Sequence, residues 1–262
     1  MVKEKQDKFT VIPFPKVRQP VVDSLHQSKH MSTIHSLIEI DVTDTRKWVK
    51  DFRKTAGGSL SFTAFLTFCL AKAIDENKIV HAYRRRGNLI VYDYVDIAVV
   101  IEREIGDERA PIYPHVVKAA NTKTLEQIHE GIRTAQKGED APRMQKWINL
   151  YWYLPGFLRS LLWRTWLCSP YWRKRLTGTV GMSAVGMFGR GSGWGIPVPA
   201  YNLSVTVGGI SEKPGVVKGE IKIREYLSIT ASFNHDIIDG VPAARFMQRF
   251  RELVGSGYGL HD

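Results

Sequence analysis

The sequence is poor in cysteine and in long apolar runs, and both shortages limit what the protein can be. Cys69 and Cys168 are its two cysteines, and neither has another cysteine nearby. A disulfide framework and a cysteine-based zinc site are therefore not expected, and both thiols are expected to be buried in a reducing compartment. The best candidate for a membrane span, residues 59–74, is short and contains serine and threonine. It predicts a buried core helix rather than a membrane span.

The N-terminal residues and the histidines exclude further classes. The first fifteen residues are polar and charged, without the apolar run of a secretory signal, so a cytoplasmic protein is expected. His26 and His30 lie four residues apart, but no third ligand accompanies them, and no metal site is expected. Hydrophobic residues make up 44% of the chain, which predicts a folded domain rather than a disordered one.

Acidic residues are also scarce, which leaves a formal charge of +11 that is unevenly distributed. Residues 133–175 hold nine Lys or Arg against two acids, together with five of the seven tryptophans. Within them, 143–175 predicts two helical pieces hinged at Pro155-Gly156. Aromatic residues among arginines are typical of a water–lipid interface, which suggests peripheral membrane contact. They also suit a cover over a hydrophobic acyl chain, or packing on the domain or a neighbouring protomer. Nucleic-acid binding is not expected, because no binding motif is present.

Strand-like and helix-like patterns alternate along the rest of the chain. Strands are expected at 33–43, 178–189, 202–210, 219–225 and 226–236, and 88–102 is expected to form strands on both sides of a turn near Asp93. Helices are expected at 21–29, 61–76, 124–136 and 242–254. The pattern predicts one α/β domain over residues 1–262, with a sheet at its centre. An N-terminal arm (1–20) and a Trp/Arg-rich insertion (about 137–176) are set apart by composition.

One motif carries the chemistry. FNHDIIDGVPAARF (233–246) predicts a strand, then His235, then Asp239 and Gly240 at the start of a helix. A histidine at such a corner can act as a general base near neutral pH. Asp239 is placed to fix the loop, and Gly240 permits a tight turn. The spacing alone also fits a surface histidine beside a helix-capping aspartate.

HDIIDG (235–240) resembles the H-x-x-x-D-G motif of the acyltransferase components of 2-oxo acid dehydrogenase complexes, which chloramphenicol acetyltransferase shares. TGTVGMSAVGMFG (177–189) resembles the family segment that carries a transition-state-stabilising serine or threonine, and Ser183 occupies that position. Segments 16–30 and 208–240 fall in the family's order. The resemblance covers nearly the whole chain except about 137–176, and implies a chloramphenicol acetyltransferase-like mixed β-sheet flanked by helices.

The resemblance also implies residue roles. His235 would deprotonate an incoming thiol or hydroxyl that attacks a thioester, and Ser183 would hydrogen-bond the developing oxyanion. Asp239 would be structural, with Arg18 as its partner. Coenzyme A or acyl-CoA would be a substrate, without a tightly bound cofactor. Family members are trimers or assemblies of trimers in which the histidine and serine meet across a subunit interface, so a homotrimer is expected.

Three departures from the family are visible. Asp236 stands where arginine usually follows the histidine, and Ala184 stands where asparagine usually follows the serine. A lipoyl domain is missing, so no lipoyl attachment is expected in this chain. The leading prediction is a CoA-dependent acyltransferase with an unidentified thiol, hydroxyl or amine acceptor. The alternatives are a transacylase core served by a lipoyl-carrying protein in trans, and a catalytically silent trimeric scaffold.

Overall fold

The computed structural model describes residues 10, 14–15, 18–27, 31–55, 60–101, 103–105, 108–110, 114–137, 150–151, 153–186 and 191–261. Most of the predicted arm 1–20 and residues 138–149 of the insertion lie outside the described residues.

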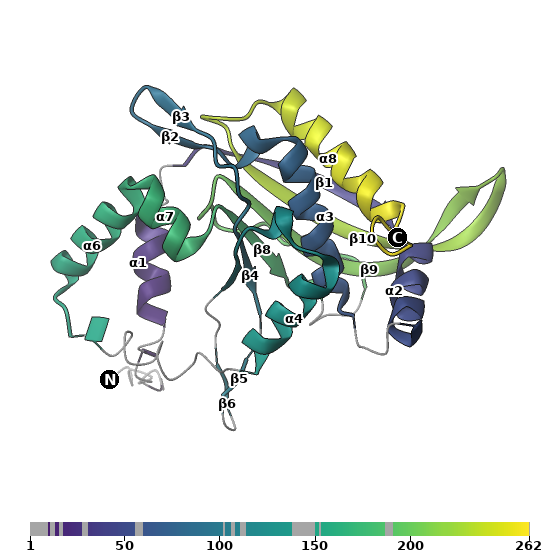
Figure 1. Cartoon of the computed structure of the whole chain (residues 1–262), viewed down its shortest axis with the longest axis horizontal. Coiled ribbons are helices and arrows are strands. Elements are labelled where there is room, and N and C mark those ends of the chain that lie inside the picture. The colour runs from purple at the N-terminus through teal and green to yellow at the C-terminus, as the bar shows by residue number, and fades with distance from the viewer. Residues whose placement is uncertain are drawn as a thin grey trace, which may run out of the picture.

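A six-stranded mixed sheet forms the centre of the molecule, with strand order β1-β10-β9-β8-β4-β7 (Figure 1). Its strands are β1 (Thr33–Asp41), β4 (Ile97–Val100), β7 (His115–Val117), β8 (Val180–Ala184), β9 (Leu203–Val217) and β10 (Glu220–Asn234). β8 runs parallel to both β4 and β9, and the other neighbours are antiparallel. Two hairpins stand outside the sheet: β2 (Tyr83–Arg85) with β3 (Asn88–Ile90), and β5 (Arg103–Ile105) with β6 (Glu108–Ala110). The predicted α/β class is confirmed.

One face of this sheet is covered by helices that bury the main apolar core. They are α2 (Thr43–Thr55), α3 (Phe62–Glu76), α4 (Leu125–Gln136) and α8 (Gly240–Gly255). α3 is the predicted core helix, and its N-terminus is capped by Ser61, whose Oγ accepts a hydrogen bond from the Ala64 N–H at 3.0 Å. α8 packs on β1 and α3, where Phe246 meets Phe233 of β10 edge to face. These contacts fix β10 against the helices and therefore fix the strand end that carries the HDIIDG motif.

β10 corrects the expectation of two separate strands at 219–225 and 226–236, because it is continuous from Glu220 to Asn234. The polar pair Arg224-Glu225 breaks the apolar alternation in the sequence, yet both side chains have partners. Arg224 donates to Asp41 and Asp44 at 2.7 and 2.6 Å, and Glu225 pairs with Arg46. The hydrogen bond from Arg224 holds the pKa of Asp44 below its ordinary value. Ion pairs with the end of β1 and with α2 thus stabilise β10 at Arg224 and Glu225, where its sequence is polar.

The insertion forms a second helical group with α1 (Gln19–Gln27), beside the sheet (Figure 1). α6 (Gly156–Cys168) begins after Pro155, as the predicted hinge requires, and α7 (Pro170–Thr177) follows a further break at Ser169. Asp23 of α1 joins the group together: its carboxylate accepts from the Tyr151 hydroxyl at 2.5 Å and pairs with Arg159 at 3.2 Å. The inner side of the insertion is therefore docked through partly buried polar contacts.

The two cysteines differ in environment. Cys69 lies inside α3, where burial raises the pKa of its thiol, whereas Cys168 is exposed at the end of α6. The expectation that both would be buried is wrong for Cys168, because the last turn of α6 faces outward. Within the described ranges, no helix combines the length and the apolar character needed to cross a membrane.

Acid should destabilise the fold through His81, which lies buried at the end of the short 3-10 helix Lys78–His81 after α3 and shares a 3.0 Å hydrogen bond with Thr179. Burial lowers the pKa of His81 to about 4. The unfolded chain binds this proton near pH 6.5 and the folded chain does not, so stability is lost as pH falls from about 6.5 to 4, by up to about 3 kcal/mol. Urea unfolding at several pH values should show that slope, and it should flatten in His81→Gln. An equal slope in both proteins would contradict the assignment.

Candidate active site

His235 lies at the corner that the sequence predicts, directly after β10. Its backbone N–H donates to the Ser32 carbonyl at 2.8 Å, which continues the strand ladder to this residue. The side chain is 46% exposed, and Nδ1 lies 3.7 Å from Oδ1 of Asp239, which is 83% exposed. That separation exceeds a hydrogen bond, so the carboxylate acts on the ring mainly as a nearby charge. The imidazole is open to an incoming group.

Ser183 lies on β8, on the sheet face away from the main helical layer. Its neighbour Met182 is buried on the helical side, where its sulfur accepts a hydrogen bond from Thr67. Side chains alternate along a strand, so Ser183 faces the opposite side, together with Gly181. The Tyr201 ring packs so closely on Gly181 that an added Cβ would lie 2.5 Å from it. The serine is thus half-buried under the segment that leads into β9.

The strand register separates the two predicted catalytic groups within one chain. Ser183 stands opposite Thr206 of β9, and Thr206 stands opposite Thr230 of β10. His235 is five positions further along, which corresponds to roughly 16 Å at about 3.3 Å per residue, and two strand spacings separate β8 from β10. The Ser183 hydroxyl and the His235 ring therefore cannot act on one carbonyl carbon within a single chain.

Two supporting roles differ from expectation in the single chain. Arg18 is exposed immediately before α1, and among the described residues no ion pair joins it to Asp239. The predicted Arg18–Asp239 pair is not formed here, because Asp239 faces outward beside His235. Gly240 has no left-handed backbone angle, and an added Cβ would meet nothing within 4 Å. The turn before α8 therefore does not depend on glycine for its geometry.

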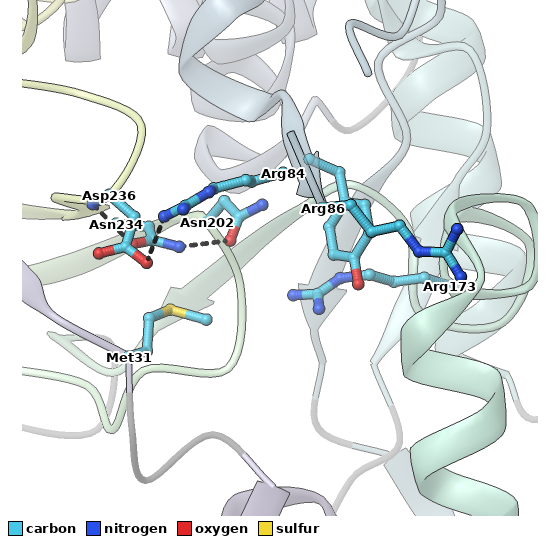
Figure 2. Close-up of a pocket in the computed structure, with 8 residues that line it drawn as sticks. Met31, Arg84, Arg86, Arg173, Asn202, Asn234 and Asp236 are labelled. Atoms are coloured by element: carbon cyan, nitrogen blue, oxygen red, sulfur yellow. Dashed lines mark hydrogen bonds and ion pairs between the residues drawn. The ribbon is translucent and has the colours of Figure 1, made fainter. Parts of the chain in front are cut away.

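A cavity of about 390 Å³ opens beside the histidine, and Figure 2 shows the side chains around it. It is lined by residues from five separate stretches: Met31, Tyr83, Arg84, Arg86, Arg173, Asn202, Asn234 and Asp236. The residues before and after His235 both belong to this lining. His235 itself is not among the lining residues, so the cavity adjoins the motif through the two neighbours of the proposed base.

A hydrogen-bond network holds the backbone on both sides of His235. The Asn234 side chain accepts from the Asp236 N–H at 3.0 Å and donates to Asn202 at 3.1 Å. Asn202 in turn donates to the Ala82 carbonyl at 2.7 Å, which ties the motif to the β2–β3 hairpin. Asp236, the departure from the family pattern, pairs with Arg84 at 3.5 Å. The carboxylate at this position thus has a partner on the hairpin.

Sequence reasoning missed most of the cavity. Tyr83 and Arg84 stand far from Asn202 in the chain, and none of them belongs to a motif, so no local pattern could group them. Arg173 was visible as one cation of the Trp/Arg-rich stretch, but its direction was not. Asp236 was the one residue whose identity could have indicated the cavity, because a carboxylate beside His235, where the family has arginine, is expected to have a cationic partner.

Comparison with known proteins gives one consistent result. The family model described as 2-oxoacid dehydrogenases acyltransferase (catalytic domain) matches residues 6–145 and 176–258. The lipoamide acyltransferase component of the branched-chain alpha-keto acid dehydrogenase complex from Bacillus subtilis is 24% identical over 256 residues, which cover 94% of this chain and 52% of that protein. This chain thus spans about half the length of the curated relatives it matches.

Two solved structures show the same fold. One belongs to crystallographic and enzymatic work on a serine, a histidine and an asparagine in the catalytic mechanism of Azotobacter vinelandii dihydrolipoamide acetyltransferase. It has a TM-score of 0.74 and 19% identity, and covers 99% of this chain and 96% of that one. A chloramphenicol acetyltransferase has a TM-score of 0.52 and 13% identity, and covers 93% and 97%. The expected sheet architecture is confirmed by both.

Gly240→Ala should leave the fold intact, because the added methyl group meets open space and alanine favours helix by up to about 1 kcal/mol over glycine. Gly208→Ala is the matched control: its Cβ would lie 2.0 Å from the Gly193 carbonyl oxygen, and it should unfold at much lower temperature. Thermal melts of both variants test this. A large stability loss in Gly240→Ala would mean that the motif needs glycine for a reason within the chain.

Proposed function

The chain belongs to the family of 2-oxoacid dehydrogenase acyltransferase catalytic domains, and on that premise we propose that this acyltransferase moves an acyl group between coenzyme A and a thiol, hydroxyl or amine acceptor. The observation that carries the proposal is the placement of His235: an exposed imidazole at the end of β10, beside a cavity whose lining includes both neighbouring residues. An exposed imidazole can take the proton from an acceptor that approaches it.

Each group has one role in the proposed reaction. His235 removes the proton from the acceptor, whose sulfur, oxygen or nitrogen attacks the thioester carbonyl carbon. The carbonyl oxygen becomes an oxyanion, and the Ser183 hydroxyl donates a hydrogen bond to it. When the intermediate collapses, the carbon–sulfur bond breaks and the protonated His235 returns the proton to the departing coenzyme A thiolate. The reverse direction uses the same groups.

The Azotobacter vinelandii acetyltransferase supports this assignment through spacing. The serine in that protein precedes its histidine by the same number of residues that separate Ser183 from His235. Its asparagine follows the histidine by four positions, as Asp239 does here. The three residue positions therefore agree together, whereas a chance histidine near a helix start would match none of the others.

We place the complete site between two copies of the chain, because the register keeps Ser183 and His235 apart within one copy. A homotrimer, expected from the family resemblance, offers three equivalent interfaces at which the serine of one protomer meets the histidine of another. Coenzyme A would enter this interface as a substrate.

A transacylase core served by a lipoyl-carrying protein in trans is the second candidate, and the names of the relatives favour it. The Bacillus subtilis relative is a lipoamide acyltransferase component. The two functions differ only in the acceptor, so dihydrolipoamide offered beside simple thiols and amines separates them. A silent scaffold would transfer to none of these acceptors.

Variants of the two catalytic residues should complement each other when mixed. His235→Ala alone should lose about a hundredfold to ten-thousandfold in turnover, and Ser183→Ala about a hundredfold in kcat with little change in KM. In randomly mixed trimers about a quarter of the interfaces combine an intact serine with an intact histidine, so about a quarter of the activity should return. Turnover of a thioester after mixing and reassembly measures this. Two inactive variants that stay inactive when co-assembled would contradict the shared site.

The outer side of the insertion supports a further function, contact with an anionic membrane surface. Phe157 and Leu161 are one turn apart on α6 and are 76% and 54% exposed. Arg164 follows Leu161 by three residues and lies on the same face of α6. On α7, Trp172 is 44% exposed, and the Arg175 guanidinium lies over its ring. Aromatic and aliphatic side chains beside arginines match the chemistry of an acidic headgroup layer. The inner side is docked on α1, so this outer side is free of the contacts that hold the insertion.

The double variant Phe157→Ser/Leu161→Ser should lose binding to phosphatidylcholine vesicles that contain phosphatidylserine, and wild-type binding should weaken as salt rises. Val216→Ser/Ile221→Ser is the control, because those side chains are as exposed (77% and 78%) but lie on the β9–β10 hairpin at the far end of the molecule. Vesicle co-sedimentation measures the effect. Wild-type protein that stays in the supernatant, or an α6 variant that loses the trimer instead, would rule out membrane contact.

A further inference from the structure

The cavity beside His235 has an excess of positive charge. Arg84, Arg86 and Arg173 line it, and Asp236 is the one carboxylate in the lining. Asp236 pairs with Arg84, and both side chains are about half exposed, so this pair neutralises one cation weakly. In the part of the chain that the structure describes, no carboxylate forms an ion pair with Arg173 or Arg86. The cavity therefore presents two cationic groups without an internal counter-charge.

Arg173 is held in place by specific contacts. Its guanidinium stacks over the Tyr83 ring at 5.1 Å, and Nη2 donates to the Ala200 carbonyl at 3.3 Å. Figure 2 shows it extending from α7 into the cavity, toward the side on which Asn202 lies. These contacts use one face and one N–H of the guanidinium. The other N–H groups of the Arg173 guanidinium are therefore held in a fixed orientation, in which they can donate two hydrogen bonds to one anion.

The helix that carries Arg173 is itself anchored to the core. Tyr92 donates to the Pro170 carbonyl at 3.1 Å at the start of α7, and Lys118 donates to the carbonyls of Lys174 and Arg175 at its end. A cation at a helix C-terminus also stabilises the helix dipole. α7 is therefore a fixed platform for Arg173 rather than a loosely attached segment.

Arg173 belongs to this chain rather than to the family pattern. The family model matches residues up to 145 and resumes at 176, so the insertion that supplies Arg173 falls between the two matched parts. The other lining residues come from matched segments. The insertion thus adds a cation to a cavity whose other lining residues all lie in the matched segments.

We propose that the Arg173 cavity binds an anionic oxygen group of the thioester substrate, a phosphate of coenzyme A or a carboxylate at the far end of the acyl chain, and so selects the substrate. This inference rests on the proposed function for the identity of the substrate. The cavity volume of about 390 Å³ has room for such a group and for part of the chain that bears it. Arg173 is a specificity residue in this scheme, and His235 remains the base.

Inorganic pyrophosphate is the first probe, because its binding requires no turnover. Isothermal titration at low salt should show wild-type binding and about a tenfold to hundredfold loss in Arg173→Gln, as expected for a charge-assisted hydrogen-bonded pair. Arg173→Lys keeps the charge and should retain part of the affinity. Arg175→Gln is the matched control: it removes one cation from the same helix, outside the cavity lining, and should bind as wild type does. No wild-type binding, or equal losses in Arg173→Gln and Arg175→Gln, would overturn the proposal.

The source of the anion follows from two substrate pairs. If the group is the 3′-phosphate, Arg173→Gln should bind coenzyme A more weakly while binding of 3′-dephospho-coenzyme A changes little; if it is the pyrophosphate, the variant should bind both compounds more weakly. If it is a carboxylate, the variant should raise KM for succinyl-CoA and leave acetyl-CoA unchanged. Equal values for wild type and variant with all four compounds would also overturn the proposal. His235→Ala should bind pyrophosphate normally, so failure of acyl transfer and failure of the anion site remain distinguishable.

Discussion

β10 hydrogen-bonds to β1 along one side and to β9 along the other, and the positions of the proposed catalytic groups depend on that double pairing. The ladder continues to His235, whose N–H still donates to Ser32, so the histidine is carried on the rigid end of a strand rather than on a free loop. A base must be held within a fraction of an ångström of its working position. The same register that holds His235 also keeps it apart from Ser183, and for this reason we place the proposed site between two chains.

Much of this architecture could be predicted from the sequence, because local patterns control it. The apolar run of α3, the strand through Asp41 and the corner at His235 each have a signal within about fifteen residues. The continuity of β10 could not be predicted, because Arg224 and Glu225 interrupt the alternation and their partners lie at the end of β1 and in α2, nearly 180 residues earlier. Long-range charge pairing leaves no local pattern.

The residues of the candidate site also fall into a part that the sequence predicts and a part that it does not. His235, Ser183 and Asp239 belong to motifs and could be named from spacing and resemblance, whereas the cavity beside them joins stretches that are unrelated in sequence. Arg18 is the opposite case: its pair with Asp239 rests on the family position alone, does not occur among the ion pairs of the described residues, and stays a prediction. A pair inferred from resemblance assumes the backbone geometry of the relative, and at identities near 20% that geometry is shared as a fold but not contact by contact.

Two features that set this chain apart from the family pattern, Asp236 and the insertion, meet in one place. Asp236 replaces the usual arginine after the histidine, and the charge change is answered by Arg84 on the hairpin. The insertion then brings Arg173 to the same cavity, stacked on Tyr83 of that hairpin. The cationic groups at this cavity therefore come from the hairpin and the insertion rather than from the HDIIDG motif. A fold that is kept while the charges around its proposed base are rearranged fits a change of substrate. In the proposed mechanism His235 and Ser183 supply the chemistry of acyl transfer, and selection depends on what surrounds them.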